Sequence, residues 1–105
     1  MITEFNMPDC VSGDHCDEQS FYINFPDNSP VDLTGARIQV RTVRDANILS
    51  TDDTDQIEIT SAVGGEFVIK EQKIDWPADL YDYRLSITFA DGRKKTFVIG
   101  TWNII

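Results

Sequence analysis

Residues 81–89 read YDYRLSITF, and this stretch decides the fold class. Its apolar and aromatic side chains stand at every second position, at Tyr81, Tyr83, Leu85, Ile87 and Phe89, with polar residues between them. A period of two is typical of a β-strand with one face in the core and the other in water. The pattern predicts a central strand whose odd-numbered side chains are buried.

The same alternation recurs in shorter runs on both sides of this stretch. The runs cover residues 21–25, 37–41, 57–59, 67–69, 97–99 and 102–104. Turn-forming residues separate them, at 26–28, 34–35, 45–47, 64–65, 77, 91–92 and 100. About seven short strands at this spacing predict an all-β, antiparallel two-sheet sandwich. The 105 residues suffice for one domain, 1–105, in which 1–19 form an N-terminal extension that packs on the sandwich or leaves it.

The last hairpin has two possible registers. A two-residue loop would turn the apolar side chains of the final strand outward, because a slip of one residue exchanges the two faces. A three-residue loop at 90–92 instead pairs Leu85 with Phe97 and Tyr83 with Ile99. Burial favours this second register, which requires a positive φ at Gly92.

Charge is distributed unevenly along the chain. The net charge is -9, from 18 acidic and 9 basic residues. Residues 1–35 carry seven acids and no Lys or Arg, whereas residues 36–44 carry three Arg and no acid. Such a surface repels nucleic-acid phosphates and anionic lipid, so we expect no nucleic-acid partner.

No apolar run approaches the ~20 residues of a membrane span. The first residues also lack the basic and apolar segments of a signal peptide, so we expect the chain to be cytoplasmic when it is made.

The three arginines in the basic segment are candidate interface residues. The charge asymmetry serves either solubility or charge matching between neighbouring copies. In the second interpretation Arg37, Arg41 and Arg44 oppose acids on a neighbour, and Tyr22 and Trp102 are the apolar anchors, since exposed ion pairs contribute little each.

Two cysteines lie close together in the acidic N-terminal part. Cys10 and Cys16, with His15 beside the second, are weak candidates for a metal site that lacks paired C-x-x-C ligands. A disulfide is geometrically possible but requires an oxidising compartment. Two ordinary thiols in a loop are the favoured interpretation, and we predict neither metal nor cofactor.

Catalytic patterns are missing from the sequence. His15 is the one histidine, no G-x-S-x-G elbow is present, and Gly64-Gly65 is followed by no lysine that would mark a phosphate loop. The acidic run at 52–55 does not match the spacing of a calcium-binding EF-hand loop, although a loose surface calcium site stays open. We predict that the chain is not an enzyme.

Two local patterns have structural interpretations. In Asp32-Leu33-Thr34-Gly35, the side chains of Asp32 and Thr34 are expected to bond nearby amides, Gly35 frees the backbone, and Leu33 plugs the end of the sandwich. Asp79 and Tyr81 resemble a tyrosine corner, in which the hydroxyl of a Tyr near a strand start bonds back to nearby backbone.

The order of features over residues 31–100 resembles a family of small bacteriophage and prophage structural proteins. The matching stretches are 31–36 leading into 38–40, then 64–67, 80–85, 91–92 and 97–100. The resemblance covers about two thirds of the chain. It implies an immunoglobulin-like β-sandwich, and a place in the virion as a tail, baseplate or neck component.

The resemblance leads to a first functional hypothesis and leaves two others open. The first is a non-enzymatic virion protein that contacts copies of itself or other phage structural proteins as a homo-oligomer. The second is a carbohydrate- or metal-binding surface module, in which Trp76 and Trp102 are possible stacking platforms. The third is a regulatory or immunity protein whose acidic surface mimics nucleic acid.

Overall fold

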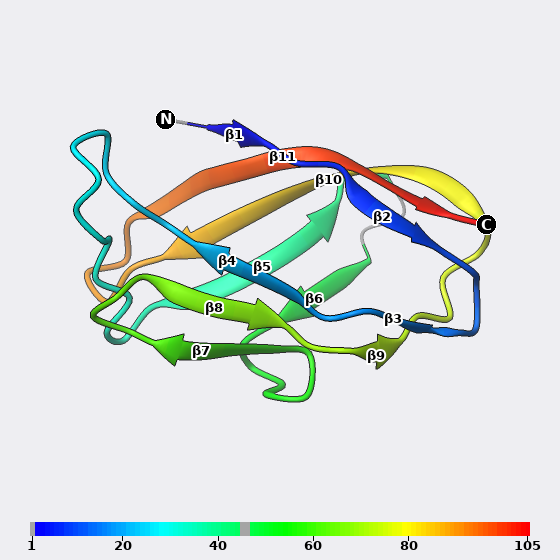
Figure 1. The fold of residues 1–105 in the computed structure, drawn as a ribbon, viewed down its shortest axis with the longest axis horizontal. Coiled ribbons are helices and arrows are strands. Elements are labelled where there is room, and N and C mark those ends of the chain that lie inside the picture. The colour runs from blue at the N-terminus through cyan, green and yellow to red at the C-terminus, as the bar shows by residue number, and fades with distance from the viewer. Residues whose placement is uncertain (1, 45–46) are drawn as a thin grey trace.

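Strand β10 (Asp79–Thr88) lies at the centre of the fold (Figure 1). A computed structural model describes residues 2–44 and 47–105. Asp45 and Ala46, part of the turn predicted at 45–47, lie outside the described residues, as does Met1. Along β10, Tyr81, Tyr83, Leu85 and Ile87 are buried and the residues between them are more exposed, which confirms the predicted alternation as far as Ile87. Phe89 lies beyond the end of β10 and is only partly buried, contrary to the prediction.

Strand β10 belongs to a six-stranded sheet of the order β1-β11-β10-β5-β6, in which β2 also pairs with β11. The bounds are β1 (Thr3–Glu4), β2 (Met7–Cys10), β5 (Arg37–Thr42), β6 (Ile48–Ser50) and β11 (Lys94–Ile104). Strands β1 and β2 run parallel to β11, whereas the other pairs are antiparallel. The two ends of the chain therefore meet along one edge of this sheet.

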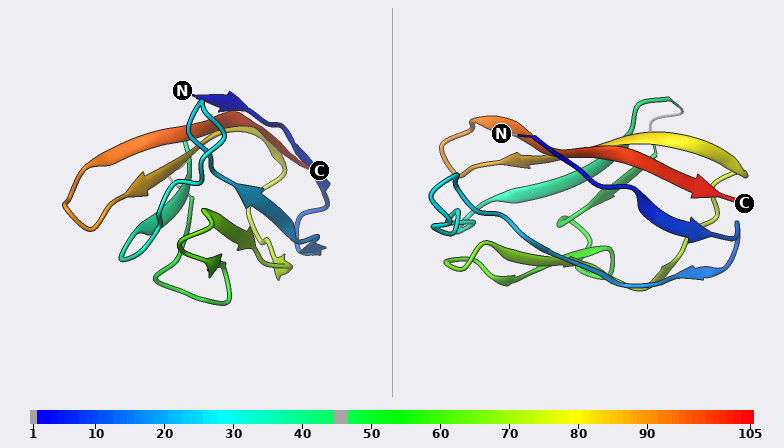
Figure 2. Two further views of the ribbon diagram at one scale, coloured as in Figure 1. Left: turned by 60° about the vertical axis from the view of Figure 1, so that its left-hand side comes forward. Right: turned by 45° about the horizontal axis from the view of Figure 1, so that its top comes forward.

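Two smaller sheets form the opposite layer. One has the order β4-β8-β7, and the other pairs β3 with β9. The bounds are β3 (His15–Cys16), β4 (Gln19–Tyr22), β7 (Ile57–Ser61), β8 (Glu66–Ile69) and β9 (Gln72–Lys73). Figure 2 shows both small sheets facing one side of the large sheet. Buried apolar side chains from both layers form one core cluster. The arrangement is all-β and resembles a sandwich.

The described residues hold eleven strands and no helix, against about seven strands predicted. Five strands were not predicted: β1, β2, β3, β6 and β9. Each is four residues or shorter and most of their side chains are exposed, so the hydrophobic pattern that reveals longer strands is missing. The N-terminal segment is thus part of the sheets.

The β10–β11 hairpin confirms one half of its prediction and contradicts the other. The amide of Gly92 donates to the carbonyl of Phe89, and Gly92 has a φ of 91°, as the three-residue loop requires. A bulge between Leu85 and Ser86 then shifts the register, so that Leu85 pairs with Val98 and not with Phe97. The predicted pairing of Tyr83 with Ile99 is also wrong, because Tyr83 pairs with Gly100.

The bulge reverses the faces of β11 partway along its length. Lys94 and Thr96 pair with the outward residues of β10, whereas Val98 and Trp102 pair with inward residues. Val98 is 3% exposed and Ile99 is 38% exposed, the opposite of the predicted faces. Because the bulge adds one residue to β11, this strand can carry basic side chains near the hairpin loop and still bury apolar side chains in its C-terminal half.

The turn at residues 32–35 has the predicted construction. One carboxylate oxygen of Asp32 accepts hydrogen bonds from the amide of Thr34 at 2.9 Å and from its hydroxyl at 2.6 Å. These bonds hold the pKa of Asp32 below its ordinary value, because they favour the charged carboxylate. Leu33 is fully buried, and Gly35 has a φ of 71°.

A tyrosine at the start of β10 bonds back to the preceding backbone. The hydroxyl of Tyr81 donates to the carbonyl of Pro77 at 2.6 Å, a bond of the kind expected from the sequence. Asp79 accepts from the amide of Leu80 at 2.8 Å and also pairs with Arg44. These contacts fix the loop that leads into the central strand.

Candidate functional site

The outward side chains of β5, β10 and β11 form one continuous surface, here called the outer face. Residues directly paired in a sheet share a face. Arg84 on β10 pairs with Arg41 on β5 and with Ile99 on β11. Two positions further along the strand, Ser86 pairs with Gln39 and with Thr96. All of these side chains therefore lie on the side of the sheet opposite the core.

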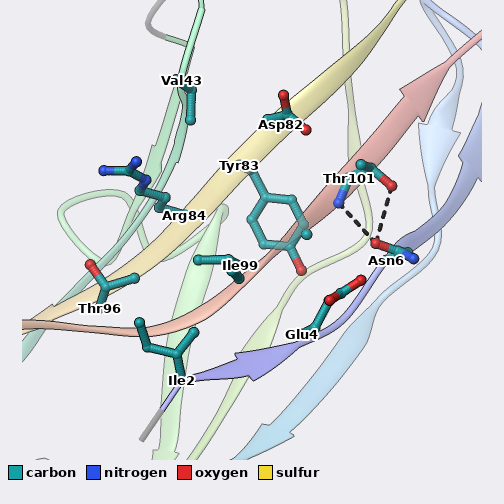
Figure 3. Close-up of a pocket in the computed structure, with 11 residues that line it drawn as sticks. Ile2, Glu4, Asn6, Val43, Asp82, Tyr83, Arg84, Thr96, Ile99 and Thr101 are labelled. Carbon is teal, nitrogen blue, oxygen red and sulfur yellow. Dashed lines mark hydrogen bonds between the residues drawn. The ribbon is translucent and has the colours of Figure 1, made fainter.

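The outer face is hollowed into a groove of two adjoining parts. The larger part has a volume of about 680 Å³ and lies between the N-terminal segment and the end of β5 (Figure 3). The smaller part, of about 300 Å³, extends toward Lys94, next to the loop of the β10–β11 hairpin. Val43, Arg84 and Thr96 line both parts, which makes them one surface, here called the outer-face groove.

Two arginines face each other on the floor of this groove. Arg84 and Arg41 are direct cross-strand partners, and like charges in this arrangement are unfavourable. Among the ion pairs of the described residues, neither arginine has an acidic partner, and neither does Lys94. Glu4 and Asp82 also line the larger part of the groove but form none of these ion pairs, so Arg41, Arg84 and Lys94 place unpaired positive charge on the face of an acidic chain.

Exposed apolar side chains lie beside these cations. Ile2 is 55% exposed, Val43 is 60% exposed and Ile99 is 38% exposed, and all three line the larger part of the groove. Figure 3 shows Val43 and Arg84 on one side of the hollow, and Ile2 and Glu4 on the other. Exposed apolar side chains gathered in one hollow are typical of an interaction surface.

The three arginines predicted to form one row have different surroundings in the structure. Arg41 lines the outer-face groove. Arg37 is on the same strand but pairs with Asp52 of its own chain, and Arg44 pairs with Asp79 at 2.7 Å. The acids that neutralise Arg37 and Arg44 therefore come from within the molecule, whereas Arg41 has no ion pair among residues 2–44 and 47–105.

The two predicted apolar anchors do not join this surface. Tyr22 is 66% exposed but belongs to β4, in the opposite layer. Trp102 is 4% exposed, and its ring lies edge-on to Trp76 at 5.3 Å and to Tyr83 at 6.5 Å. The prediction that Trp102 is an interface residue is wrong, since it is part of the core.

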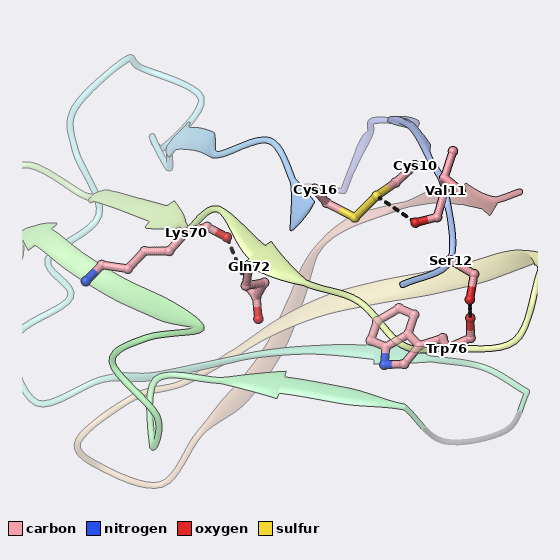
Figure 4. Close-up of a disulfide and its surroundings, with 7 residues drawn as sticks. All are labelled: Cys10, Val11, Ser12, Cys16, Lys70, Gln72 and Trp76. Atoms are coloured by element: carbon pink, nitrogen blue, oxygen red, sulfur yellow. Dashed lines mark hydrogen bonds between the residues drawn. A yellow bond between two sulfur atoms is a disulfide. The ribbon is translucent and has the colours of Figure 1, made fainter. Parts of the chain in front are cut away.

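The cysteines form a disulfide, which corrects the favoured interpretation of two free thiols. The Sγ atoms of Cys10 and Cys16 are 1.96 Å apart, and the pair closes the loop between β2 and β3 (Figure 4). Both sulfurs are thereby used, so the weak metal site with His15 has lost its two thiolate ligands. His15 is exposed on β3, paired with Lys73 of β9.

The acidic run at 52–55 is occupied by local contacts. Asp52 pairs with Arg37, and Asp53 accepts a hydrogen bond from the amide of Asp55 at 2.9 Å. Within the ranges 2–44 and 47–105, no three His, Cys, Asp or Glu side chains gather as metal ligands would.

The groove offers guanidinium donors, hydroxyls and apolar contacts, which suit binding of a carboxylate-bearing surface.

Sequence reasoning missed most of the outer-face groove. Arg84 stands at an outward position of the best-predicted strand, so the alternation in residues 81–89 already placed it in solvent. Its juxtaposition with Arg41 and Ile99 depends on strand order and on the bulge, neither of which the sequence pattern contains. Ile2 lines the groove because the parallel pairing of β1 with β11 brings the N-terminal segment beside it.

Comparison with known proteins adds no relative. No protein-family model and no curated protein matches this chain. In the part of the chain that the structure describes, no helix has the length and apolar character needed to cross a membrane.

Proposed function

We propose that this chain is a non-enzymatic virion structural or assembly protein of a phage or prophage, acting through protein–protein contacts. The observation that carries the proposal is the outer-face groove, where Arg41 and Arg84 face each other without an acidic partner among the described residues. A neighbouring protein that supplies carboxylates relieves this repulsion, and the exposed apolar residues beside it add buried area.

The immunoglobulin-like type is also a proposal, supported by strand order. In a variable-type domain one sheet contains strands G, F, C and C′, and the other contains B, E and D. The order β11-β10-β5-β6 matches the first and β4-β8-β7 matches the second. Tyr81, at the start of the strand that corresponds to F, bonds back to Pro77 as a tyrosine corner does. The Cys10–Cys16 disulfide lies within one loop and does not join two sheets.

Together with the resemblance to phage structural proteins, this order favours a tail, baseplate or neck component. The chain is then made in the host cytoplasm and resides in the virion. An oxidised Cys10–Cys16 pair fits a mature particle outside the reducing cytoplasm.

The alternative of a carbohydrate-binding module has less support. Of the two predicted stacking platforms, Trp102 is buried and Trp76 packs against it, so neither tryptophan offers a free ring face for a sugar. The metal-binding form of that alternative loses its thiolates to the disulfide.

The test uses particles purified from the host that carries this gene. We expect mass spectrometry to find the chain in particles, and the variant Arg41→Glu/Arg84→Glu to be depleted from them. Lys95→Glu is the matched control, because Lys95 pairs with the inward Ile87 and so lies off the outer face. Particles that never contain the wild-type chain overturn the virion proposal, and equal incorporation of both variants overturns the role of the groove.

A further inference from the structure

The end of the molecule that carries the disulfide is acidic, and this end is here called the acidic tip. It consists of residues 9–18 with the adjoining Ile105. Its exposed acids are Asp9, Asp14, Asp17 and Glu18, and no Lys or Arg occurs in residues 1–35. The tip is thus complementary in charge to the cations of the outer-face groove, with one cation, Lys73 of β9, paired beside it with His15.

The acidic tip also presents apolar side chains. Val11 is 50% exposed and Ile105 is 58% exposed. The amide of Ser12 donates to the carbonyl of Ile105 at 3.0 Å, and the amide of Ile105 donates to the carbonyl of Cys10 at 2.8 Å. These bonds hold the two apolar residues beside the acids, as the groove holds Ile2, Val43 and Ile99 beside its cations.

We propose that the outer-face groove binds the acidic tip of a second copy of this chain. This inference rests on the proposed function, in that it names the partner of the same surface. Carboxylates of the tip approach Arg41, Arg84 and Lys94, while Val11 and Ile105 cover the apolar part of the groove. Complementary charge sets the orientation and apolar burial contributes most of the affinity.

A second copy suits the groove better than a polyanion such as a nucleic acid. The net charge of -9 repels a second copy as well, but an extended polyanion that passes beyond the groove keeps its charges against the acidic surface along its whole length. The acidic tip is compact, and its disulfide limits the conformations of its loop before binding, so less entropy is lost on association.

The two surfaces lie on different parts of the molecule. The tip is at the C-terminal end in Figure 1, whereas the groove is on the outer face of the sheet beside the N-terminal strand. A contact between different surfaces is heterologous, so a pair of copies keeps one free groove on one copy and one free tip on the other. Repetition of such a contact gives a closed ring or an open filament.

The experiment measures the mass of the purified, oxidised protein by size-exclusion chromatography with light scattering over a range of concentrations. We expect oligomers that grow with concentration and whose association weakens in ~0.5 M salt, because salt screens exposed charges. The groove variant is Arg41→Glu/Arg84→Glu and the tip variant is Val11→Ser/Asp14→Asn/Asp17→Asn. Each is expected to weaken self-association roughly tenfold or more, and Lys95→Glu is expected to leave it unchanged.

Mixing the two variants distinguishes this contact from a symmetric one. The tip variant keeps a native groove and the groove variant keeps a native tip, so the mixture is expected to form a one-to-one complex that grows no further. Absence of that complex, with both variants folded by circular dichroism, overturns the proposal.

A wild-type chain that stays monomeric but is present in particles overturns this inference and leaves the proposed function standing. Self-association through tip and groove, with no incorporation into particles, overturns the proposed virion function and leaves the tip-to-groove contact standing. Binding of a labelled oligonucleotide to the groove, lost in Arg41→Glu/Arg84→Glu, would assign the surface to nucleic acid instead.

Discussion

The hydroxyl of Tyr83 donates a hydrogen bond to the carbonyl oxygen of Phe5, a residue 78 positions earlier in the chain. Tyr83 is 1% exposed, so the bond satisfies a polar group that would otherwise be buried without a partner. It reaches the backbone between β1 and β2, where the N-terminal segment crosses from one strand to the other. Through this bond the central strand holds the N-terminal segment, which forms one edge of the groove, against the core.

This bond predicts a loss of stability at alkaline pH. Burial raises the pKa of Tyr83 above its ordinary value of 10.0, so the folded chain keeps the proton when the unfolded chain has lost it. The contribution is complete below about pH 10 and decreases as the pH rises further. We expect the urea midpoint to fall above about pH 10, and Tyr83→Phe to reduce this slope. At pH 7 Tyr83→Phe is expected to cost about 1 kcal/mol.

The control for the alkaline prediction is Tyr22→Phe, since Tyr22 is 66% exposed. This variant should keep both the wild-type stability at pH 7 and the wild-type slope. Equal slopes in the wild type and Tyr83→Phe would contradict the assignment.

The variant Gly100→Ala is expected to displace the N-terminal segment. A Cβ at Gly100 would lie 1.9 Å from the carbonyl oxygen of Phe5, and backbone must move to admit it. We expect a loss of roughly 1–3 kcal/mol in chemical denaturation, together with faster hydrogen exchange at the amide of Phe5. Gly92→Ala is the comparison, because a Cβ there meets no atom within 4 Å and only the positive φ is strained. Unchanged exchange at Phe5 in Gly100→Ala would show that the close approach is absent.

Reduction of the Cys10–Cys16 disulfide is expected to lower stability modestly. The two residues are separated by six positions, and closing so short a loop removes little entropy from the unfolded chain. The loop-entropy relation gives about 2 kcal/mol. Urea titrations with and without reductant measure the difference, and Cys10→Ser/Cys16→Ser should not respond to reductant. A reductant-insensitive wild type would mean that the bond does not form.

Trp102→Ala is expected to destabilise the fold by about 3–5 kcal/mol, because it removes a large buried ring that packs between two other aromatic residues. Tyr22→Ala, on the exposed side of β4, is expected to change stability by under about 0.5 kcal/mol. Thermal unfolding with circular dichroism is sufficient to compare them. A folded, fully stable Trp102→Ala that loses only self-association would return Trp102 to the interface.

The sequence pattern predicted the longest strands well because they combine alternation with full burial of one face. Residues 81–89 show this best, and the turn at 32–35 was predictable because Asp32 and Thr34 bond locally. The bulge at Leu85 was not predictable from alternation alone. The bulge leaves one residue of β11 unpaired but moves Val98 and Trp102 into the core. Which register is the more stable therefore depends on how the two layers pack.

The candidate site was only partly visible in the sequence. The cluster of three arginines pointed to β5, but two of them are neutralised by Asp52 and Asp79, which are distant in the sequence. The sequence leaves the disulfide open beside two free thiols, because the spacing of Cys10 and Cys16 permits the bond but its formation also requires an oxidising compartment. Exposed apolar groove residues such as Val43 give no periodic signal, so only the folded sheet identifies them.

The parallel pairing of β1 and β2 with β11 has a consequence for folding. Strands β1 and β2 find their partner only once β11 has been synthesised, so this sheet is completed late in folding. Contacts of such high sequence separation slow folding, since a long loop must close before any of them forms. Until then β11 has an open edge, and a chain in this state is exposed to pairing with the wrong neighbour.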